Sequence, residues 1–121
     1  MNRLTKRLFA DVAHTVLVLD PAGDRIRYAN RSGCRLLGYE LSELLATPIS
    51  SVYREQASEL ERFLTRVIEY GHGWTKSLTL RTSRGASIPA EIFALPIERG
   101  SRPLVLVLAA DRSQHRTPAP T

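Results

Sequence analysis

The sequence predicts an α+β domain in which helices pack on one antiparallel β-sheet. Three observations support this prediction: a short hairpin lies near the start, a long amphipathic helix lies in the middle, and β-segments separated only by short turns follow it. Connections this short join antiparallel neighbours, whereas parallel strands need long crossovers. With 121 residues, 43% of them hydrophobic, the chain can bury one core without disulfides or a structural metal.

The first segments are expected to form a helix and a hairpin. Leu4, Leu8, Phe9 and Val12 lie on one stripe at helical spacing, which predicts an N-terminal helix over residues 1–13. Next, Thr15–Asp20 (TVLVLD) and the alternating Arg25–Ala29 flank the turn signal Pro21–Asp24 (PAGD). These two segments therefore predict a β-hairpin.

Three short helical segments are expected after the hairpin. Asn30 is a suitable N-cap for a helix over Arg31–Leu37, and Gly38 stands where a left-handed residue would end it. Leu41–Leu45 predicts one further turn of helix. A third helix is expected to begin at Thr47–Pro48, because proline is well tolerated at the first helical position.

Glu55–Tyr70 gives the strongest helical pattern in the chain. Its apolar residues recur at helical spacing on one stripe: Leu60, Phe63, Leu64, Val67 and Ile68. On the polar side, the spacing of Glu59 with Arg62 and of Arg66 with Glu69 favours ion pairs. Gly71 and Gly73 are expected to end the helix.

Three strands are expected in the rest of the chain. The first, Trp74–Arg81, places Trp74, Leu78 and Leu80 on one face. A turn at Ser83–Gly85 leads to Ala86–Ile97, and residues 98–101 lead to Leu104–Ala110. Since the last strand is apolar on both faces, we expect it to lie in the centre of the sheet.

The charge distribution argues against nucleic-acid binding. The chain carries 17 Lys and Arg against 12 Asp and Glu, but five of the basic residues lie in residues 1–13 or after Asp111. The globular part is therefore close to neutral, whereas nucleic-acid binders concentrate basic residues on a folded face. No apolar run approaches the length of a membrane span, and nothing resembles a secretory signal. We therefore expect no membrane insertion and a cytoplasmic location.

The ordered set of segments resembles a PAS domain, a sensory and signalling module, over about Leu8 to Ser113. The residues that carry the resemblance are Val16–Asp20, Tyr28–Asn30, Leu36–Tyr39, Ser42–Leu45, Pro48–Ile49, Gly85, Ile88–Ile92, Pro96–Ile97 and Asp111–Ser113. The resemblance implies a five-stranded antiparallel sheet in the order 2-1-5-4-3, with helices on one face. Residues 14–113 would form this domain, and residues 114–121 a polar, proline-rich tail or linker.

The expected role is sensing and dimerisation in a bacterial signalling protein. A downstream output domain in the same chain would be a histidine kinase, a cyclic-dinucleotide enzyme or a transcriptional regulator. The helices can cover only one face of the sheet, so the N-terminal helix, a second copy of the chain, or both must cover the other. We predict a homodimer in which the N-terminal helix packs on that other face. No catalytic motif is recognisable, so we expect no enzymatic activity.

The alternative role is that of a redox or gas sensor with a bound flavin or haem. Flavin-binding photosensors of this family carry an adduct-forming cysteine after a Gly-Tyr pair. Counting from Gly38 and Tyr39 places that position near Ile49, whereas the single cysteine, Cys34, precedes the pair. Haem-binding members use a histidine on the long helix, and Glu55–Tyr70 contains none, while His72 follows it. We therefore expect no cofactor and a colourless protein.

Two groups of residues are candidates for function. Polar and aromatic residues that could face a small-ligand cavity are Asn30, Tyr53, Tyr70 and Trp74, with Arg35 and Tyr39 as further candidates. At the exit of the domain, the resemblance implies that Asp111 and Ser113 pass a signal to the following segment. Arg81 and Arg84 are the expected partners of the Asp111 carboxylate.

Overall fold

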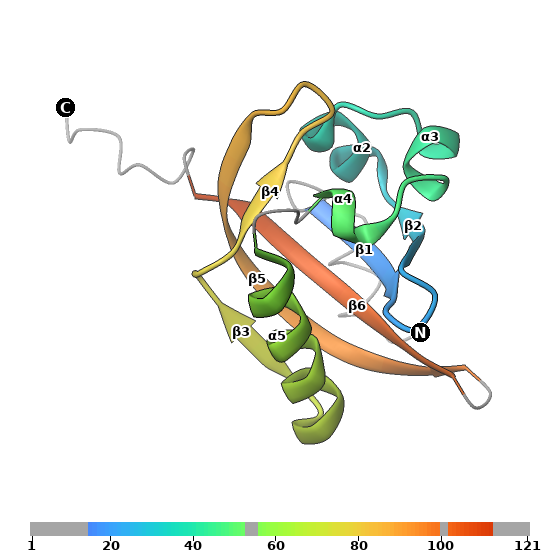
Figure 1. The fold of residues 1–121 in the computed structure, drawn as a ribbon, viewed down its shortest axis with the longest axis vertical. Coiled ribbons are helices and arrows are strands. Elements are labelled where there is room, and N and C mark those ends of the chain that lie inside the picture. The colour runs from blue at the N-terminus through green and yellow to red at the C-terminus, as the bar shows by residue number, and fades with distance from the viewer. Residues whose placement is uncertain (1–14, 53–55, 100–101, 113–121) are drawn as a thin grey trace, which may run out of the picture.

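The computed structural model describes residues 15–52, 56–99 and 102–112. An antiparallel sheet forms the frame of the molecule (Figure 1). Its strands are β1 (Thr15–Asp20), β2 (Arg25–Ala29), β3 (Gly73–Thr75), β4 (Thr79–Arg81), β5 (Ser87–Arg99) and β6 (Arg102–Asp111). The strand order is β2-β1-β6-β5-β3, and β4 also pairs with β5. The predicted α+β fold and the central position of the last strand are confirmed.

The third predicted strand is in fact two, so the sheet has six strands rather than five. Thr75 pairs with Ile92, and Thr79 pairs with Pro89. The chain therefore advances four residues from Thr75 to Thr79 while β5 advances only three, from Pro89 to Ile92. The extra residue is a bulge between β3 and β4, and a bulge exchanges the faces to which later side chains point. Leu78 and Leu80 therefore face the core, while Trp74 faces outward.

Gln56 holds the outer edge of this bulge. Its side-chain Nε2 donates to the Ser77 carbonyl at 3.0 Å, and its Oε1 accepts from the Thr79 backbone N–H at 2.7 Å. The amide therefore pairs with the strand edge as a neighbouring backbone would. Gln56 directly precedes α5, so this contact joins the start of the long helix to the sheet.

The helices agree closely with their predicted bounds. They are α2 (Arg31–Leu37), α3 (Leu41–Leu45), α4 (Ile49–Val52) and α5 (Ala57–Tyr70). Asn30 caps α2 as expected, since its Oδ1 accepts from the Gly33 N–H at 2.8 Å. The same oxygen accepts from Val16 N–H at 3.1 Å, which ties the cap to β1. Gly38 ends the helix in the left-handed region, with φ of 80°.

Two details of the helices differ from the sequence-based expectation. The third short helix begins after Pro48, because Pro48 forms an isolated bridge with Arg25 of β2. On α5, the expected ion pairs between Glu59 and Arg62 and between Arg66 and Glu69 are not formed within the described ranges. These side chains are exposed, where such pairs contribute little to stability.

The helices cover one face of the sheet and leave the other uncovered by helices of the described chain (Figure 1). On the covered face, α5 packs on β3, β5 and β6, while α2 packs on β1 and α3 on β2. Alternate residues of the central strands point into this core: Leu17, Leu19, Ile92, Ala94, Val105 and Val107. The expected N-terminal helix of residues 1–13 and the tail of residues 114–121 lie outside the described residues.

Candidate functional site

A groove opens on the helical face between α5, α4 and the β1–β2 turn, and we call it the α4–α5 groove. Its volume is about 510 Å³, within the range of small-molecule sites. Apolar side chains make most of its surface: Ile49, Leu60, Leu64, Ile68 and Pro103. At its rim, the Ser50 N–H and hydroxyl donate to the Asp24 carboxylate at 3.0 and 2.8 Å, which fixes the turn against α4. An apolar ligand with few polar groups would fit this groove.

A buried charge cluster lies beside the β1–β2 turn. Asp20 is fully buried, and its Oδ2 accepts from Arg27 Nη2 at 2.9 Å while its Oδ1 accepts from Arg102 Nε at 3.1 Å. Burial raises the pKa of Asp20, but hydrogen bonds from Arg27 and Gly23 and the charges of Arg102 and Arg27 outweigh it. The pKa of Asp20 therefore lies below its ordinary value, and the carboxylate stays ionised.

Asp20 was predicted only as the last residue of the first strand, beside the turn, and it also takes part in that turn. The Gly23 backbone N–H donates to Asp20 Oδ1 at 3.2 Å, as turn chemistry requires. The contact with Arg102 joins residues that are 82 positions apart in the sequence, and no local sequence pattern predicted it. The cluster therefore fixes the first hairpin to the start of the central strand β6.

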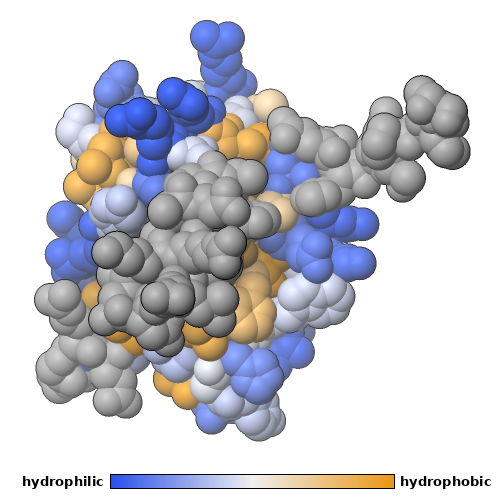
Figure 2. Space-filling view, turned by 180° about the vertical axis from the view of Figure 1, so that it is seen from behind, coloured by the Kyte–Doolittle hydropathy of each residue, from blue (hydrophilic) through white to orange (hydrophobic). Residues whose placement is uncertain are grey.

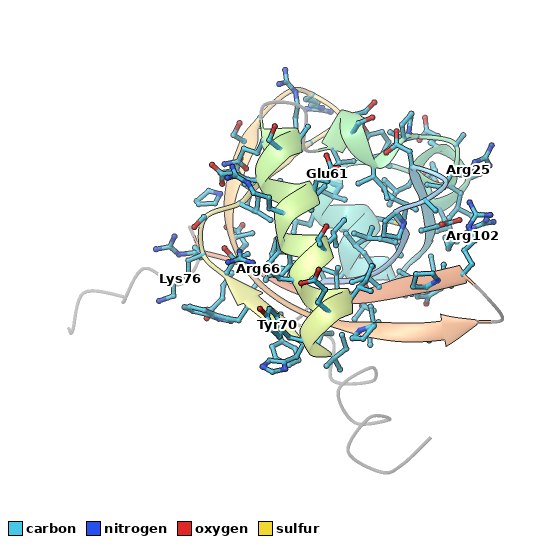
Figure 3. All side chains as sticks on the ribbon, turned by 60° about the horizontal axis from the view of Figure 1, so that its bottom comes forward. Arg25, Glu61, Arg66, Tyr70, Lys76 and Arg102 are labelled. Atoms are coloured by element: carbon cyan, nitrogen blue, oxygen red, sulfur yellow. The ribbon has the colours of Figure 1, made fainter. Side chains whose placement is uncertain are left out.

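The predicted cavity residues do not gather in one place. Asn30 serves as a cap, and Tyr53 lies outside the described residues. Tyr70 and Trp74 are 71% and 54% exposed, so the prediction that they face an interior cavity is wrong for both. Tyr70 ends α5 on its solvent side (Figure 3), and the bulge turns Trp74 outward, where its Nε1 donates to Glu91 Oε2 at 2.7 Å.

Arg35 and Tyr39 line a different groove, beside the edge strand β2. This groove has a volume of about 550 Å³ and also includes Tyr28 and Cys34. Cys34 packs partly against the core, as expected of a small apolar residue. Burial and the nearby Glu40 carboxylate raise the pKa of the Cys34 thiol, so the thiol stays protonated at neutral pH.

The predicted signal-transfer residues lie at one end of the sheet. Asp111 ends β6 opposite Ala90, and Arg81 ends β4 opposite Ser87, so both strands flank the same part of β5. Arg84 is exposed in the following turn, and Ser113 lies outside the described residues. The pairing of Asp111 with Arg81 or Arg84 stays a prediction.

Apolar side chains gather on the face of the sheet that the described helices leave open, and we call it the outer face. Strand register places its members opposite one another: Val18 with Tyr28 and with Leu106, Leu95 with Leu106, Phe93 with Leu108, and Trp74 with Phe93. Phe93 is 38% and Leu95 37% exposed. Figure 2 shows hydrophobic side chains on this face with charged ones at its rim. A patch of this kind marks an interaction surface.

A family model described as a PAS domain matches residues 13–114. The chain belongs to the PAS domain family. The match covers the whole sheet, all of the described helices and the predicted exit residues Asp111 and Ser113.

Solved PAS domains share this fold at low sequence identity. A PAS domain from Colwellia psychrerythraea has a TM-score of 0.75 at 17% identity, with 91% of this chain and 97% of that chain covered. A PAS domain from a two-component sensor histidine kinase has a TM-score of 0.73 at 16% identity, with coverages of 90% and 94%. The PAS domain of nitrogen regulation protein NR(II) from Vibrio parahaemolyticus has a TM-score of 0.69 at 20% identity, with coverages of 92% and 99%. None of the curated proteins matches this chain.

Two described positions bear on the flavin and haem chemistries considered from the sequence. Ile49 stands near the position of the adduct-forming cysteine and is buried in the core, while Cys34 lies on α2. His72 is exposed beyond the end of α5, so it does not project into the core as an axial haem ligand must. Within residues 15–52, 56–99 and 102–112, no cluster of three or more His, Cys, Asp or Glu could hold a metal ion. Nor is any helix there long and apolar enough to span a membrane.

Proposed function

We propose that this PAS domain is a non-catalytic sensory and dimerisation module of a bacterial signalling protein in the cytoplasm. The single observation that supports this proposal best is the outer face, on which Phe93, Leu95, Tyr28 and Trp74 remain between 37% and 54% exposed. A monomeric domain rarely leaves a contiguous apolar patch of this kind without a partner. A second copy of the chain, packed through this face and the N-terminal segment, would cover it.

The output domain is proposed to follow in the same chain, as a histidine kinase, a cyclic-dinucleotide enzyme or a transcriptional regulator. The end of β6 supports a path toward it, because the Arg112 backbone N–H donates to the Pro89 carbonyl at 2.8 Å and holds the exit against β5. The ligand class proposed for the α4–α5 groove is a small, mostly apolar molecule.

Asp111→Asn is expected to alter output while it leaves the stability of the domain almost unchanged. A partly exposed ion pair contributes only about 0.2–1 kcal/mol, which is a small part of the free energy of unfolding. The same energy is enough to shift the populations of an exit segment that has two conformations of nearly equal free energy. The measurement compares the melting temperature of the domain and the activity of the full-length protein in both forms. Equal output from wild type and variant would reject the role of Asp111.

The alternative role as a flavin or haem sensor has a direct test. We expect the purified domain to show no visible absorption band. Ile49 supplies no thiol for a flavin photoadduct, and the exposed His72 supplies no axial ligand for haem at the needed place. An absorption spectrum of the protein purified from flavin- and haem-replete cells checks this. A visible band that survives dialysis would establish the cofactor-binding role instead.

A further inference from the structure

A second groove lies on the other flank of α5, between that helix and the bulged edge of the sheet, and we call it the α5–β3 groove. Its volume is about 650 Å³, which is in the range of small-molecule sites. Ser58, Arg62 and Arg66 of α5 line one wall, and Thr75 and Ser77 line the other. The floor is apolar, formed by Phe63 and Leu78, which are only 3% and 2% exposed.

Contacts at both ends hold the two walls of this groove in place. Near the end of α5, a Cβ built on Gly73 would lie 2.5 Å from Val67 Cγ2 and 2.9 Å from Phe63 Cε1, so β3 packs against the helix without space for a side chain. At the start of α5, Gln56 donates to the Ser77 carbonyl and accepts from Thr79. Because the walls are already fixed, a ligand that binds here would not lose binding free energy to ordering them.

Two arginines and two glutamates of α5 line this groove above its apolar floor. Arg62 and Arg66 are one helical turn apart, and neither side chain makes a hydrogen bond or ion pair within the described ranges. Each guanidinium has five N–H donors in a planar fork that suits a carboxylate or phosphate. Figure 3 places Arg66 and Lys76 on the same side of α5, toward β3. Glu59 and Glu61 are the acidic residues that line this groove, and Glu61 also lines the α4–α5 groove.

We propose that the α5–β3 groove binds a small molecule with an oxyanion head and an apolar body. The head, a carboxylate or a phosphate, would lie between the Arg62 and Arg66 guanidiniums, and the Ser58, Thr75 and Ser77 hydroxyls would supply further donors. The apolar body would lie on Phe63 and Leu78. This site is separate from the α4–α5 groove, so it goes beyond the proposed sensory role and does not depend on it.

The position of the groove connects it to the exit of the domain. Arg112 Nη1 donates to the Lys76 carbonyl at 3.3 Å, and Lys76 directly precedes Ser77 in the groove wall. A ligand bound against Ser77 would therefore lie one residue from the carbonyl that holds Arg112, the residue next to Asp111.

The test uses the whole chain and two defined probes, octanoate and octyl phosphate, followed by amide chemical shifts in ¹⁵N-labelled protein. Saturable shifts are expected at Ser58, Phe63, Thr75 and Ser77. In the double variant Arg62→Gln/Arg66→Gln, binding should weaken at least tenfold, because two charge-assisted contacts are lost. Arg25→Gln/Arg31→Gln removes the same charge at exposed positions away from the groove and should bind as wild type does.

The outcomes separate the proposal from its alternatives. Tighter binding of octyl phosphate than of octanoate identifies the head as a phosphate, and the reverse order identifies a carboxylate. The proposal is overturned if neither probe gives saturable shifts at millimolar concentration, or if the shifts map to the α4–α5 groove. Equal weakening in the two double variants, or equally tight binding of uncharged octanol, would also overturn it.

Discussion

Replacing Gly73 with valine is expected to destabilise the domain by about 3 kcal/mol, the upper end of the usual cost of overpacking. Valine favours β-strands, so local propensity alone would make the change neutral or stabilising. The new Cβ would instead lie 2.5 Å from Val67 and 2.9 Å from Phe63, two buried core residues. Either α5 must move away from β3 or both side chains must change rotamer.

Thermal unfolding followed by circular dichroism measures this effect. A loss of this size corresponds to a melting temperature lower by about 12 °C for a domain of this length. Gly71→Asn is the matched control, because nothing lies within 4 Å of a Cβ at Gly71 and asparagine tolerates its left-handed backbone. Similar melting temperatures for Gly73→Val and Gly71→Asn would show that the close approach of α5 and β3 is wrong.

Asp20→Asn is expected to cost about 2 kcal/mol at neutral pH, because two arginines lose their buried carboxylate partner. The arginine side chains are 49% and 50% exposed, so water compensates them in part and keeps the loss below that of a fully buried pair. The amide retains the shape of the carboxylate, which limits the change to the charge and its hydrogen bonds.

The pH dependence of this variant has a definite sign. The pKa of Asp20 is lower in the folded protein than its ordinary value of 3.8, so the ionised carboxylate stabilises the fold above that value. This stabilisation is lost as the pH falls through the folded pKa, and wild type and Asp20→Asn should therefore converge in acid. Urea unfolding at several pH values checks this, with Glu69→Gln as a control at an exposed carboxylate. A constant difference between wild type and Asp20→Asn down to the lowest pH would contradict the assignment.

Local signals in the sequence were sufficient for most of the fold. Asn30 and Gly38 marked both ends of α2, and Pro21–Asp24 marked the hairpin turn, because capping and turn formation depend on a few adjacent residues. The apolar stripe of α5 was equally readable. The central place of β6 followed from its two apolar faces, and the strand register confirms it.

The parts that were missed depend on contacts between distant residues. The bulge between β3 and β4 arises from the register with β5 and is held by Gln56, so simple alternation placed Trp74 on the wrong face. Arg102 reaches Asp20 across 82 positions, which no local pattern reveals. The α5–β3 groove was missed for the same reason, since Arg62 and Arg66 were expected to pair with glutamates on their own helix.

Sedimentation equilibrium of the purified chain, compared with Leu95→Glu and Leu41→Glu, tests the proposed dimerisation through the outer face most directly. Leu95 is 37% and Leu41 39% exposed, but Leu95 lies on the outer face and Leu41 on α3. We expect twice the chain mass for wild type and Leu41→Glu, and the monomer mass for Leu95→Glu, because a buried unpaired carboxylate opposes association. A wild-type chain that stays monomeric at high concentration, with or without residues 1–12, would contradict the proposal, as would a Leu95→Glu variant that remains dimeric.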